Sequence, residues 1–531
     1  MKLLMSLSDT TVHIVGIGTQ VNDTFVIDTH VDEVTYSGPH DVLVEGFGEA
    51  YEIRGTVSGV GWGGGGVVDR ARNAHYAYKI PFVARWSKAN TKDIVINHHG
   101  GSPGIIQVLM REKLMGAQNP FRYSERAGDM SHGLPALLNR CAYVSTNRRG
   151  IRADGTFAAT YLPEEIPPLT AVEAAALNAT IAADPGQPGY FHPDEPVPLT
   201  PANDTPTFRD ISRALQQVVA KEMRTRRFRT RICTGNSAGA RVAASINFGR
   251  SVIGNQSVRT GGNHVVPYDA GSTRIFDGFI CNSFPADTTA DRVDAAVPIS
   301  APAFFIQGRG DEGYQQPIHV AYELLVKRVS LNHWIRIYEV KGLTHITRDI
   351  VETTVPPSDG DLMGTFVSAA IRNMKKLLSD EVQPPLSRIA GRIENGALVF
   401  DQAGGFTTKV QPVLEDPKID SLREDTLLHP RIIGPADTTR WQAVTRVLQH
   451  EPDAITPPTI GCRLGGYLVK GFGAELRPIP AETLKAMYGD FDGYKDCVEA
   501  LVGEIKEARL YDARVEPAEE TAERARELFM P

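Results

Sequence analysis

Short apolar runs recur between residues 93 and 340, and most of them have glycine close by. Such runs lack the alternation of apolar and polar positions that marks a strand with one solvated face. They are typical of parallel strands that are buried on both faces of a sheet. Six strands of this kind are predicted: Asp93–Asn97, Cys141–Thr146, Arg231–Gly235, Ile275–Asn282, Ala303–Gly308 and Trp334–Val340.

Stretches with helical periodicity alternate with these runs. The segment Phe208–Met223 places Ile211, Leu215 and Val218 on one face, as an amphipathic helix requires. Alternation of strand and helix predicts the α/β fold class, with a doubly wound, mostly parallel sheet and right-handed crossovers. The other helices predicted here are Ala238–Phe248, His319–Val329 and Phe366–Leu378.

The remaining segments divide the chain around this pattern. Residues 11–60 are rich in Val, Ile, Thr and Tyr, which predicts that residues 1–79 are a β-rich segment that extends the sheet of a core at residues 80–384. Residues 151–206 and 250–274 interrupt the core. Loops longer than about 15 residues are usually lids or binding insertions, so we expect that role for both segments. Residues 385–531 form an additional C-terminal region.

The C-terminal region has a pattern of its own. Its first part is rich in turns and Pro, with a hairpin predicted around Gly404 and Gly405. Two helices follow, at Ala481–Tyr488 and from Asp496 to about Leu510. The sequence does not decide whether this region is a separate domain or packs onto the core.

Composition and charge narrow the function classes. Hydrophobic residues make up 42% of the 531 residues and charged residues 22%, as in an average globular protein. The formal charge of −7 at pH 7 offers no basic footprint, so we expect no nucleic-acid partner. No stretch approaches the apolar length of a membrane-spanning helix, so no membrane partner is expected. The sequence leaves assembly into a homo-oligomer open.

The five cysteines are scattered, with no Cys-x-x-Cys pair and no Cys/His spacing typical of a metal site. We therefore expect reduced, mostly buried thiols, no metal and no cofactor. The first nine residues do not form a convincing export signal, because their apolar run is short and Asp9 interrupts it. These features predict a cytoplasmic protein, and an export leader outside this sequence is the open alternative.

The clearest chemical motif is Gly235-Asn236-Ser237-Ala238-Gly239, which fits Gly-x-Ser-x-Gly. In this motif a strand turns sharply into a helix, the serine lies on the strained turn, and small flanking residues allow the turn to close. The helix N-terminus also favours negative charge beside the serine. Alone the pentapeptide is a weak signal, but a buried run precedes it and a small-residue helix follows it. We predict that Ser237 is a nucleophile.

The glycine-rich segment His98–Ser102 follows the first predicted buried strand. A tetrahedral oxyanion needs two preorganised N–H donors. One is expected from Ala238, directly after the nucleophile, and the other from Gly101 or Ser102. An ordinary glycine turn between a strand and a helix is the alternative interpretation of this segment.

Two further candidates follow later strands. Asp311 lies where a carboxylate can orient a catalytic histidine; Glu312 is the alternative, and a purely polar turn is a third interpretation. His345 follows the last predicted strand and is expected to be the general base. His333 competes with it but precedes a strand, at the other edge of the sheet. The chain order Ser237, acid, histidine is that of the α/β-hydrolases.

At these residues the chain resembles the α/β-hydrolase superfamily, over about residues 80–380. The His-Gly-Gly loop together with Gly-x-Ser-x-Gly resembles carboxylesterases. The large insertion before the nucleophile helix and the long C-terminal region are loosely similar to tannase- and feruloyl-esterase-like hydrolases. Many of those carry a disulfide beside the serine and histidine, where this chain has Asn236 and Thr344. The segment Leu484–Gly489 resembles a poorly characterised bacterial α/β-hydrolase domain family.

The leading hypothesis is a serine carboxylic ester hydrolase that acts through an acyl-enzyme on a small-molecule ester, with the insertions forming a pocket over Ser237. The same fold also supports amidases, peptidases and carbon–carbon bond hydrolases, and the sequence does not separate these bond types. A hydrolase-like scaffold used only for binding is a third hypothesis. The complete set of Ser237, Asp311 and His345 argues against it.

Overall fold

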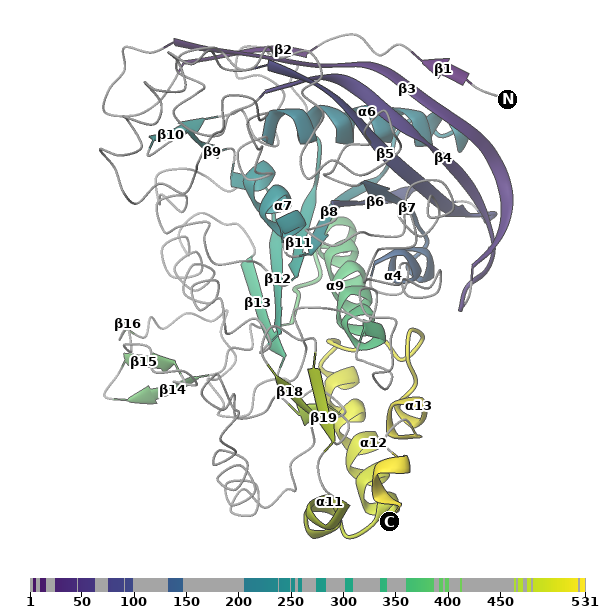
Figure 1. Cartoon of the computed structure of the whole chain (residues 1–531), viewed down its shortest axis with the longest axis vertical. Coiled ribbons are helices and arrows are strands. Elements are labelled where there is room, and N and C mark those ends of the chain that lie inside the picture. The colour runs from purple at the N-terminus through teal and green to yellow at the C-terminus, as the bar shows by residue number, and fades with distance from the viewer. Residues whose placement is uncertain are drawn as a thin grey trace.

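The computed structural model places one large sheet at the centre of the chain, with helices on both faces (Figure 1). Among the described residues, eleven strands form this sheet in the order β1-β3-β4-β5-β7-β6-β8-β11-β12-β13, and β2 pairs with β3 beside that path. The residues that the structure describes are 3–5, 10–15, 24–44, 46–62, 75–89, 91–98, 132–146, 205–236, 238–248, 250–253, 256–259, 274–282, 301–308, 335–340, 360–385, 391–394, 397–400, 411–412, 463–464, 467–470, 475–478, 481–523 and 526–530.

Within this sheet, the six strands that correspond to the predicted apolar runs pair with one another in parallel. Each of the six predicted runs is a strand: β6 Asp93–His98, β7 Cys141–Thr146, β8 Thr230–Asn236, β11 Gly278–Asn282, β12 Ala303–Gly308 and β13 Ile335–Val340. Every residue of β6, β7 and β11 is buried, which explains why these strands show no alternation.

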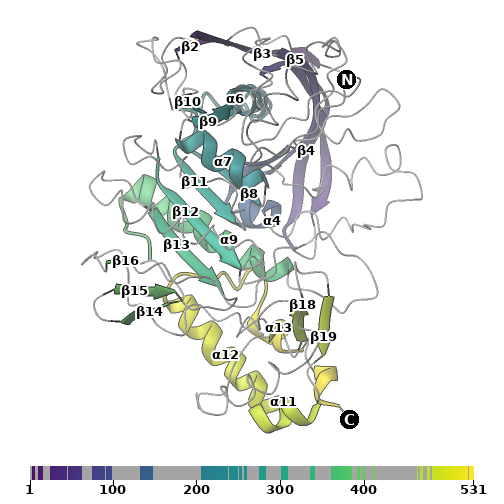
Figure 2. The same ribbon diagram turned by 60° about the vertical axis from the view of Figure 1, so that its left-hand side comes forward.

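The first part of the sheet is antiparallel, so the prediction of a mostly parallel sheet holds only from β6 to β13. A register shift between Val31 and Glu33 lets both Val31 and Val34 face the core, although three positions separate them. The strands of this part are β1 Leu3–Met5, β2 Thr10–Val15, β3 Thr24–Val44, β4 Gly48–Trp62 and β5 His75–Ser87. They form the long curved layer at the N-terminal end of the molecule (Figure 2).

Two helices, α6 (Thr205–Glu222) and α7 (Ala238–Phe248), cover one face of the sheet. Both match predicted helices closely. The other face carries α4 (Gly133–Leu138) and α9 (Gly360–Asp380), and α9 extends the helix predicted at Phe366–Leu378. The core on the α6 face includes Ile96, Val144, Leu215 and Ile246, and the core on the α9 face includes Val95, Tyr143, Val367 and Ile371.

The C-terminal helices belong to the core on the α9 face. They are α11 (Ala481–Tyr488), α12 (Phe491–Glu507), α13 (Ala518–Glu523) and the 3-10 helix η7 (Arg526–Phe529), and they lie beyond α9 at the lower end of Figure 1. Their side chains join Val367 and Ile371 in one continuous cluster. Aromatic rings tie the helices together, with centroids 5.0 Å apart for Tyr488 and Tyr494 and 5.9 Å apart for Phe491 and Phe529.

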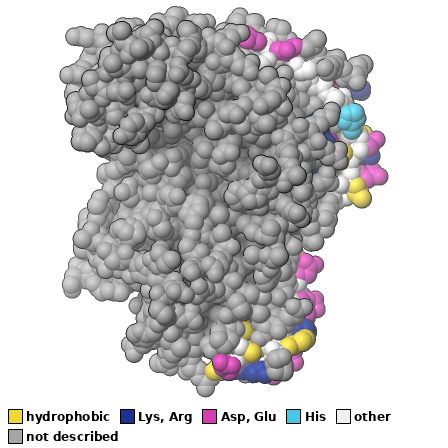
Figure 3. All heavy atoms as spheres, viewed as in Figure 1, with side chains coloured by type: hydrophobic (Ala, Val, Ile, Leu, Met, Phe, Trp, Pro, Cys, Tyr) yellow, Lys and Arg dark blue, Asp and Glu magenta, His cyan; other side chains and the backbone are white. Residues whose placement is uncertain are grey.

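The exterior of these helices carries both signs of charge. On the face in Figure 3, acidic and basic side chains of described residues lie interspersed at the lower end. Arg526 and Glu523 of the C-terminal region form an exposed pair, with nitrogen and oxygen 2.6 Å apart. Exposed pairs of this kind contribute little to stability, so the apolar core rather than the surface charges holds the C-terminal region in place.

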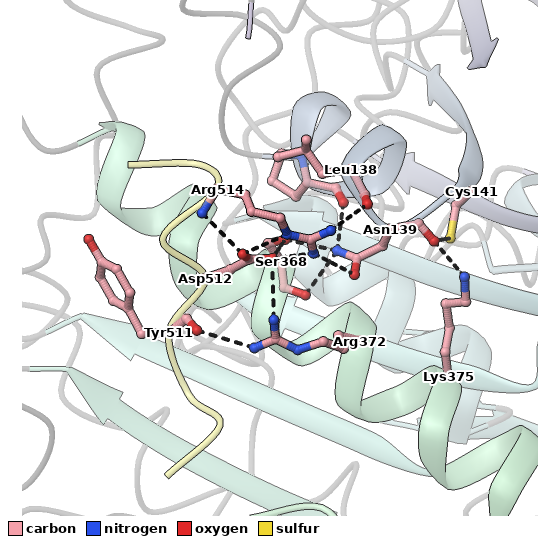
Figure 4. Close-up of polar contacts among 10 residues, drawn as sticks. Leu138, Asn139, Cys141, Ser368, Arg372, Lys375, Tyr511, Asp512 and Arg514 are labelled. Carbon is pink, nitrogen blue, oxygen red and sulfur yellow. Dashed lines mark hydrogen bonds and ion pairs between the residues drawn. The ribbon is translucent and has the colours of Figure 1, made fainter. Parts of the chain in front are cut away.

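Buried polar contacts also fix the segment between α12 and α13 to the core (Figure 4). The Asp512 carboxylate accepts a hydrogen bond from Ser368 of α9 at 2.6 Å and one from Arg514 at 2.6 Å. Arg514 also donates to the Leu138 carbonyl at the end of α4, at 2.9 Å. The Asn139 amide donates to the Ser368 hydroxyl at 2.8 Å. The C-terminal segment therefore joins α9 to α4.

Three short sheets complete the described elements. The predicted insertion at residues 250–274 begins with an antiparallel hairpin of β9 (Arg250–Ile253) and β10 (Gln256–Arg259), which was not predicted from the sequence. The predicted helix His319–Val329 and residues 151–204 lie outside the described residues, as do Gly404 and Gly405. The C-terminal sheets are β14 Gly391–Glu394, β15 Ala397–Phe400 and β16 Gln411–Pro412, then β17 Arg463–Leu464, β18 Tyr467–Lys470 and β19 Glu475–Pro478.

Candidate active site

The predicted site residues follow the ends of described strands in the chain. Ala238 is the first residue of α7. The other five, which lie outside the described residues, are Ser237, Asp311, His345, Gly101 and Ser102. Their positions in the chain follow the ends of β8, β12, β13 and β6. These four strands are parallel members of one sheet, so their carboxyl ends share an edge.

The order of the strands reverses at β6. From β6 the chain continues to β7 on one side, whereas β8 lies on the other side of β6, with His98 opposite Gly235. In open α/β sheets, ligands bind outside the carboxyl ends of the strands at such a reversal. Ser237 and the loop with Gly101 and Ser102 follow the two strands that flank this point.

The turn from β8 into α7 is sterically tight. The strand ends at Asn236 and the helix begins at Ala238, so a single residue, Ser237, separates them. A Cβ atom added at Gly235 would overlap the carbonyl of Gly239 and lie 2.7 Å from the backbone nitrogen of Ala240. Glycine is therefore required at position 235 by the close approach of two backbone segments.

His98 is a buried structural histidine. Its Nε2 lies 3.1 Å from Ser212 Oγ and its Nδ1 lies 2.9 Å from Thr146 Oγ1. Because the Ser212 hydroxyl donates to the Phe208 carbonyl, the proton of His98 is assigned to Nε2, and Nδ1 accepts from Thr146. Burial lowers the pKa of His98 to about 3. A neutral, fully enclosed imidazole anchors the end of β6 to β7 and α6 rather than serving as a general base.

A second buried polar group lies in the strands next to this edge. Asn97 of β6 donates from Nδ2 to the Tyr143 hydroxyl of β7 at 3.2 Å, and its Oδ1 accepts from the Thr234 hydroxyl of β8 at 3.2 Å. Since an unpaired buried amide is costly, this set fixes the relative position of the three strands.

A third buried polar group includes Asn236, the last residue of β8. His132, at the N-cap of α4, has Nε2 2.9 Å from Oδ1 of Asn282, the last residue of β11. Asn282 Nδ2 donates to Asn236 Oδ1 at 3.0 Å. Burial lowers the pKa of His132 to about 4, although its hydrogen bond to Asn282 acts in the opposite direction.

Neither His132 nor Asn282 was predicted from the sequence. A usable signal for Asn282 was an amide at the end of a buried run, because such a group needs a partner. No local signal marks His132, since 150 positions separate it from its partner in the chain.

Charged groups gather at the opposite edge of the sheet. Asp93, the first residue of β6, pairs with Arg229 at 2.9 Å and with Lys375 at 2.8 Å. Burial alone would raise the pKa of Asp93, but the hydrogen bonds from Arg229 and Lys375 outweigh it and leave this pKa lowered. The amino edge thus carries ion pairs, and the carboxyl edge carries neutral imidazoles, amides and hydroxyls.

The described cysteines have the protonated thiols of structural residues. Cys141, Cys233 and Cys281 are unpaired and buried in the strands. Burial raises the pKa of Cys141 to about 12 and that of Cys281 further. Since the thiolate is the reactive form, these cysteines do not supply a nucleophile near neutral pH.

Side chains that bind metal ions do not gather in the described part of the chain. Within that part, no three His, Cys, Asp or Glu side chains come together as ligands of a metal ion would. None of the described helices combines the length and the apolar character needed to cross a membrane.

No protein-family model matches this sequence, and neither does any curated protein sequence. Solved structures similar to part of it include a truncated carbohydrate esterase from gut microbiota, at 13% identity over 50% of this chain and 83% of that one, with a TM-score of 0.29. A siderophore hydrolase from Aspergillus nidulans is 12% identical over 58% and 92%, with a TM-score of 0.27. An S-formylglutathione hydrolase from Agrobacterium tumefaciens is 8% identical over 64% and 99%, with a TM-score of 0.32. We therefore base the proposed function on the chain's own residues and strand order.

Proposed function

We propose that this chain is a serine hydrolase of the α/β-hydrolase type that cleaves carboxylic esters, with Ser237 as its nucleophile. The observation that carries the proposal is the position of Ser237. It is the single residue between β8 and α7, at the carboxyl end of a strand that flanks the reversal in strand order. A serine on a tight turn from strand to helix is the arrangement that Gly-x-Ser-x-Gly produces in this class.

The proposed reaction begins with attack of Ser237 Oγ on the ester carbonyl, while His345 accepts the serine proton. The tetrahedral oxyanion then accepts hydrogen bonds from the N–H groups of Ala238 and of Gly101 or Ser102. The N-terminus of α7 adds its positive dipole end at the same place.

The intermediate collapses to an acyl-enzyme and expels the alcohol, which takes the proton from His345. Water, deprotonated by His345, then releases the carboxylic acid and regenerates Ser237. Asp311 orients the His345 ring and stabilises its charged form during both steps. The substrate in this proposal is a medium-sized carboxylic ester, held by the segments at residues 151–206 and 250–274.

Turnover of an activated aryl ester tests the proposal. We expect Ser237→Ala to lose at least about 10³-fold in kcat while keeping the wild-type melting temperature, because the substitution removes a single hydroxyl group. Unchanged turnover would exclude Ser237 as the nucleophile. Matched aryl ester and aryl amide substrates then distinguish an esterase from an amidase.

The base is tested by a matched pair of histidine variants. His345→Ala should lose about as much kcat as Ser237→Ala, since the nucleophile and its base act as a unit. His333→Ala should retain wild-type kcat, because His333 precedes the start of β13 in the chain, whereas His345 follows its end. The reverse result would assign the base to His333.

A further inference from the structure

Three buried polar side chains from distant parts of the chain are joined by hydrogen bonds at the end of β8, the strand that precedes Ser237 in the chain. Asn236 is the last residue of β8, Asn282 is the last residue of β11, and His132 precedes the first turn of α4. Their exposed fractions are 7%, 0% and 3%. The two strands are adjacent and parallel, with Asn282 opposite Asn236.

The hydrogen bonds in this group have a defined direction. Asn282 donates through Nδ2 to Asn236 Oδ1, so its own Oδ1 is the acceptor that faces His132. His132 must then carry a proton on Nε2. His132 thus donates a hydrogen bond to Asn282, and Asn282 donates one to Asn236. We call these three residues the relay.

The relay acts on the backbone next to the nucleophile. Only Ser237 separates Asn236 from α7, so the position of Asn236 limits where Ser237 can lie. A buried polar group that loses its hydrogen-bond partner is strongly disfavoured, so these hydrogen bonds resist movement of the Asn236 amide. Because small displacements of a reacting group cost a large part of the rate, such restraint matters for catalysis.

We propose that His132 and Asn282 are positioning residues, which hold the turn between β8 and α7 in place through the side chain of Asn236. The restraint on the turn is inferred from the hydrogen bonds of the relay alone. Its effect on ester turnover rests in addition on the proposed function.

Two substitutions at one position separate positioning from general stability. His132→Met removes the N–H donor, whereas His132→Gln retains an N–H donor at a similar distance from the backbone. In His132→Met we expect kcat for an aryl ester to fall about 10-fold with KM within about twofold of wild type. Amide hydrogen exchange in the peptide that spans residues 233–248 should become faster. His132→Gln should restore both properties to within about threefold of wild type.

Asn139→Ala is the matched control, because Asn139 is a buried polar residue at the other end of α4 that bonds to Ser368 and not to the turn. It should lower the melting temperature and leave kcat and exchange at residues 233–248 unchanged. If His132→Met does not fold, Asn236→Ala provides the same readouts, with faster exchange at the turn expected.

The outcomes distinguish the relay from the proposed function. Unchanged exchange at residues 233–248 in both His132→Met and Asn236→Ala would overturn the relay, and so would a His132→Gln variant that behaves like His132→Met. If the wild-type protein cleaves no ester but the exchange pattern appears, the relay stands and the proposed function fails.

Discussion

Histidine, asparagine and threonine side chains lie at the carboxyl ends of β6, β7, β8 and β11, and burial determines the protonation state of the histidines among them. His98 and His132 are enclosed, and burial lowers their pKa values to about 3 and about 4. Both are therefore neutral at physiological pH, and the hydrogen bond that His98 Nδ1 accepts from Thr146 requires this state. An ordinary histidine in the unfolded chain has a pKa near 6.5, so folding and protonation of these residues oppose each other.

This opposition predicts an acid-sensitive fold. Below pH 6.5 the unfolded state binds more protons at these two positions than the folded state, so stability is full above pH 6.5 and falls as the pH decreases. Each histidine should lower the free energy of unfolding by about 1.2 kcal/mol between pH 6 and pH 5, because the unfolded histidine is only partly protonated at pH 6. Urea unfolding at pH 7, 6 and 5 measures this.

The histidine origin of the slope has a direct control. His132→Gln removes one titrating group, so its loss of stability between pH 6 and pH 5 should be smaller by about 1.2 kcal/mol. An identical slope in wild type and His132→Gln would contradict the assignment. The carboxylates Asp93 and Asp512, whose pKa values are lowered, act in the same direction but at lower pH.

At the scale of residues, the sequence drew attention to side chains beside a recognisable motif but not to side chains whose partners are distant in the chain. It drew attention to His98 because a glycine-rich segment follows it, and the structure shows the reason for that position: a buried anchor at the end of β6. It did not identify His132, because the contact with Asn282 joins α4 to β11 and leaves no local pattern.

At the scale of elements, the short apolar runs predicted the six parallel strands, and helical periodicity predicted α6, α7 and α9. The turn from β8 into α7 follows from Gly235 and Gly239, whose backbones approach closely. The antiparallel layer was harder to place, since a register shift near Val31 disturbs the alternation on which strand prediction depends. The hairpin of β9 and β10 lies in a segment that composition alone marked as an insertion.

The close approach at the turn gives a prediction with an internal control. Gly235→Ala would bring a Cβ into the Gly239 carbonyl, so the turn must shift, and we expect ester turnover to fall at least about 10-fold. Gly503→Ala in α12 meets no heavy atom within 4 Å. It should raise stability by about 0.5–1 kcal/mol and leave turnover unchanged. Normal turnover in Gly235→Ala would contradict a functional turn at Ser237.

At the scale of the whole molecule, the C-terminal helices and the central sheet share one core. The sequence left this point open because the helices of residues 481–523 are amphipathic. Their pattern shows that each has an apolar face but does not indicate which part of the protein that face contacts. The structure places their apolar faces against α9, and Asp512 and Arg514 join α9 to α4 (Figure 4).

The buried contact at Asp512 predicts a large effect from a single substitution. Asp512→Ala removes the carboxylate bound by the buried Ser368 hydroxyl and by the half-exposed Arg514, and a buried donor left without its acceptor costs about 1–3 kcal/mol. Glu523→Ala removes an exposed pair with Arg526 and should have little measurable effect. Equal denaturation midpoints for the two variants would show that the C-terminal segment does not stabilise the core.

The nucleophilic role of Ser237 is the central claim, and covalent labelling tests it most directly. The full-length wild-type protein is treated with a serine-reactive organophosphonate, digested and analysed by mass spectrometry. We predict one equivalent of label on the peptide that contains Ser237, and no label in the Ser237→Ala variant. Labelling of a different serine, or equal labelling of the Ser237→Ala variant, would contradict the claim.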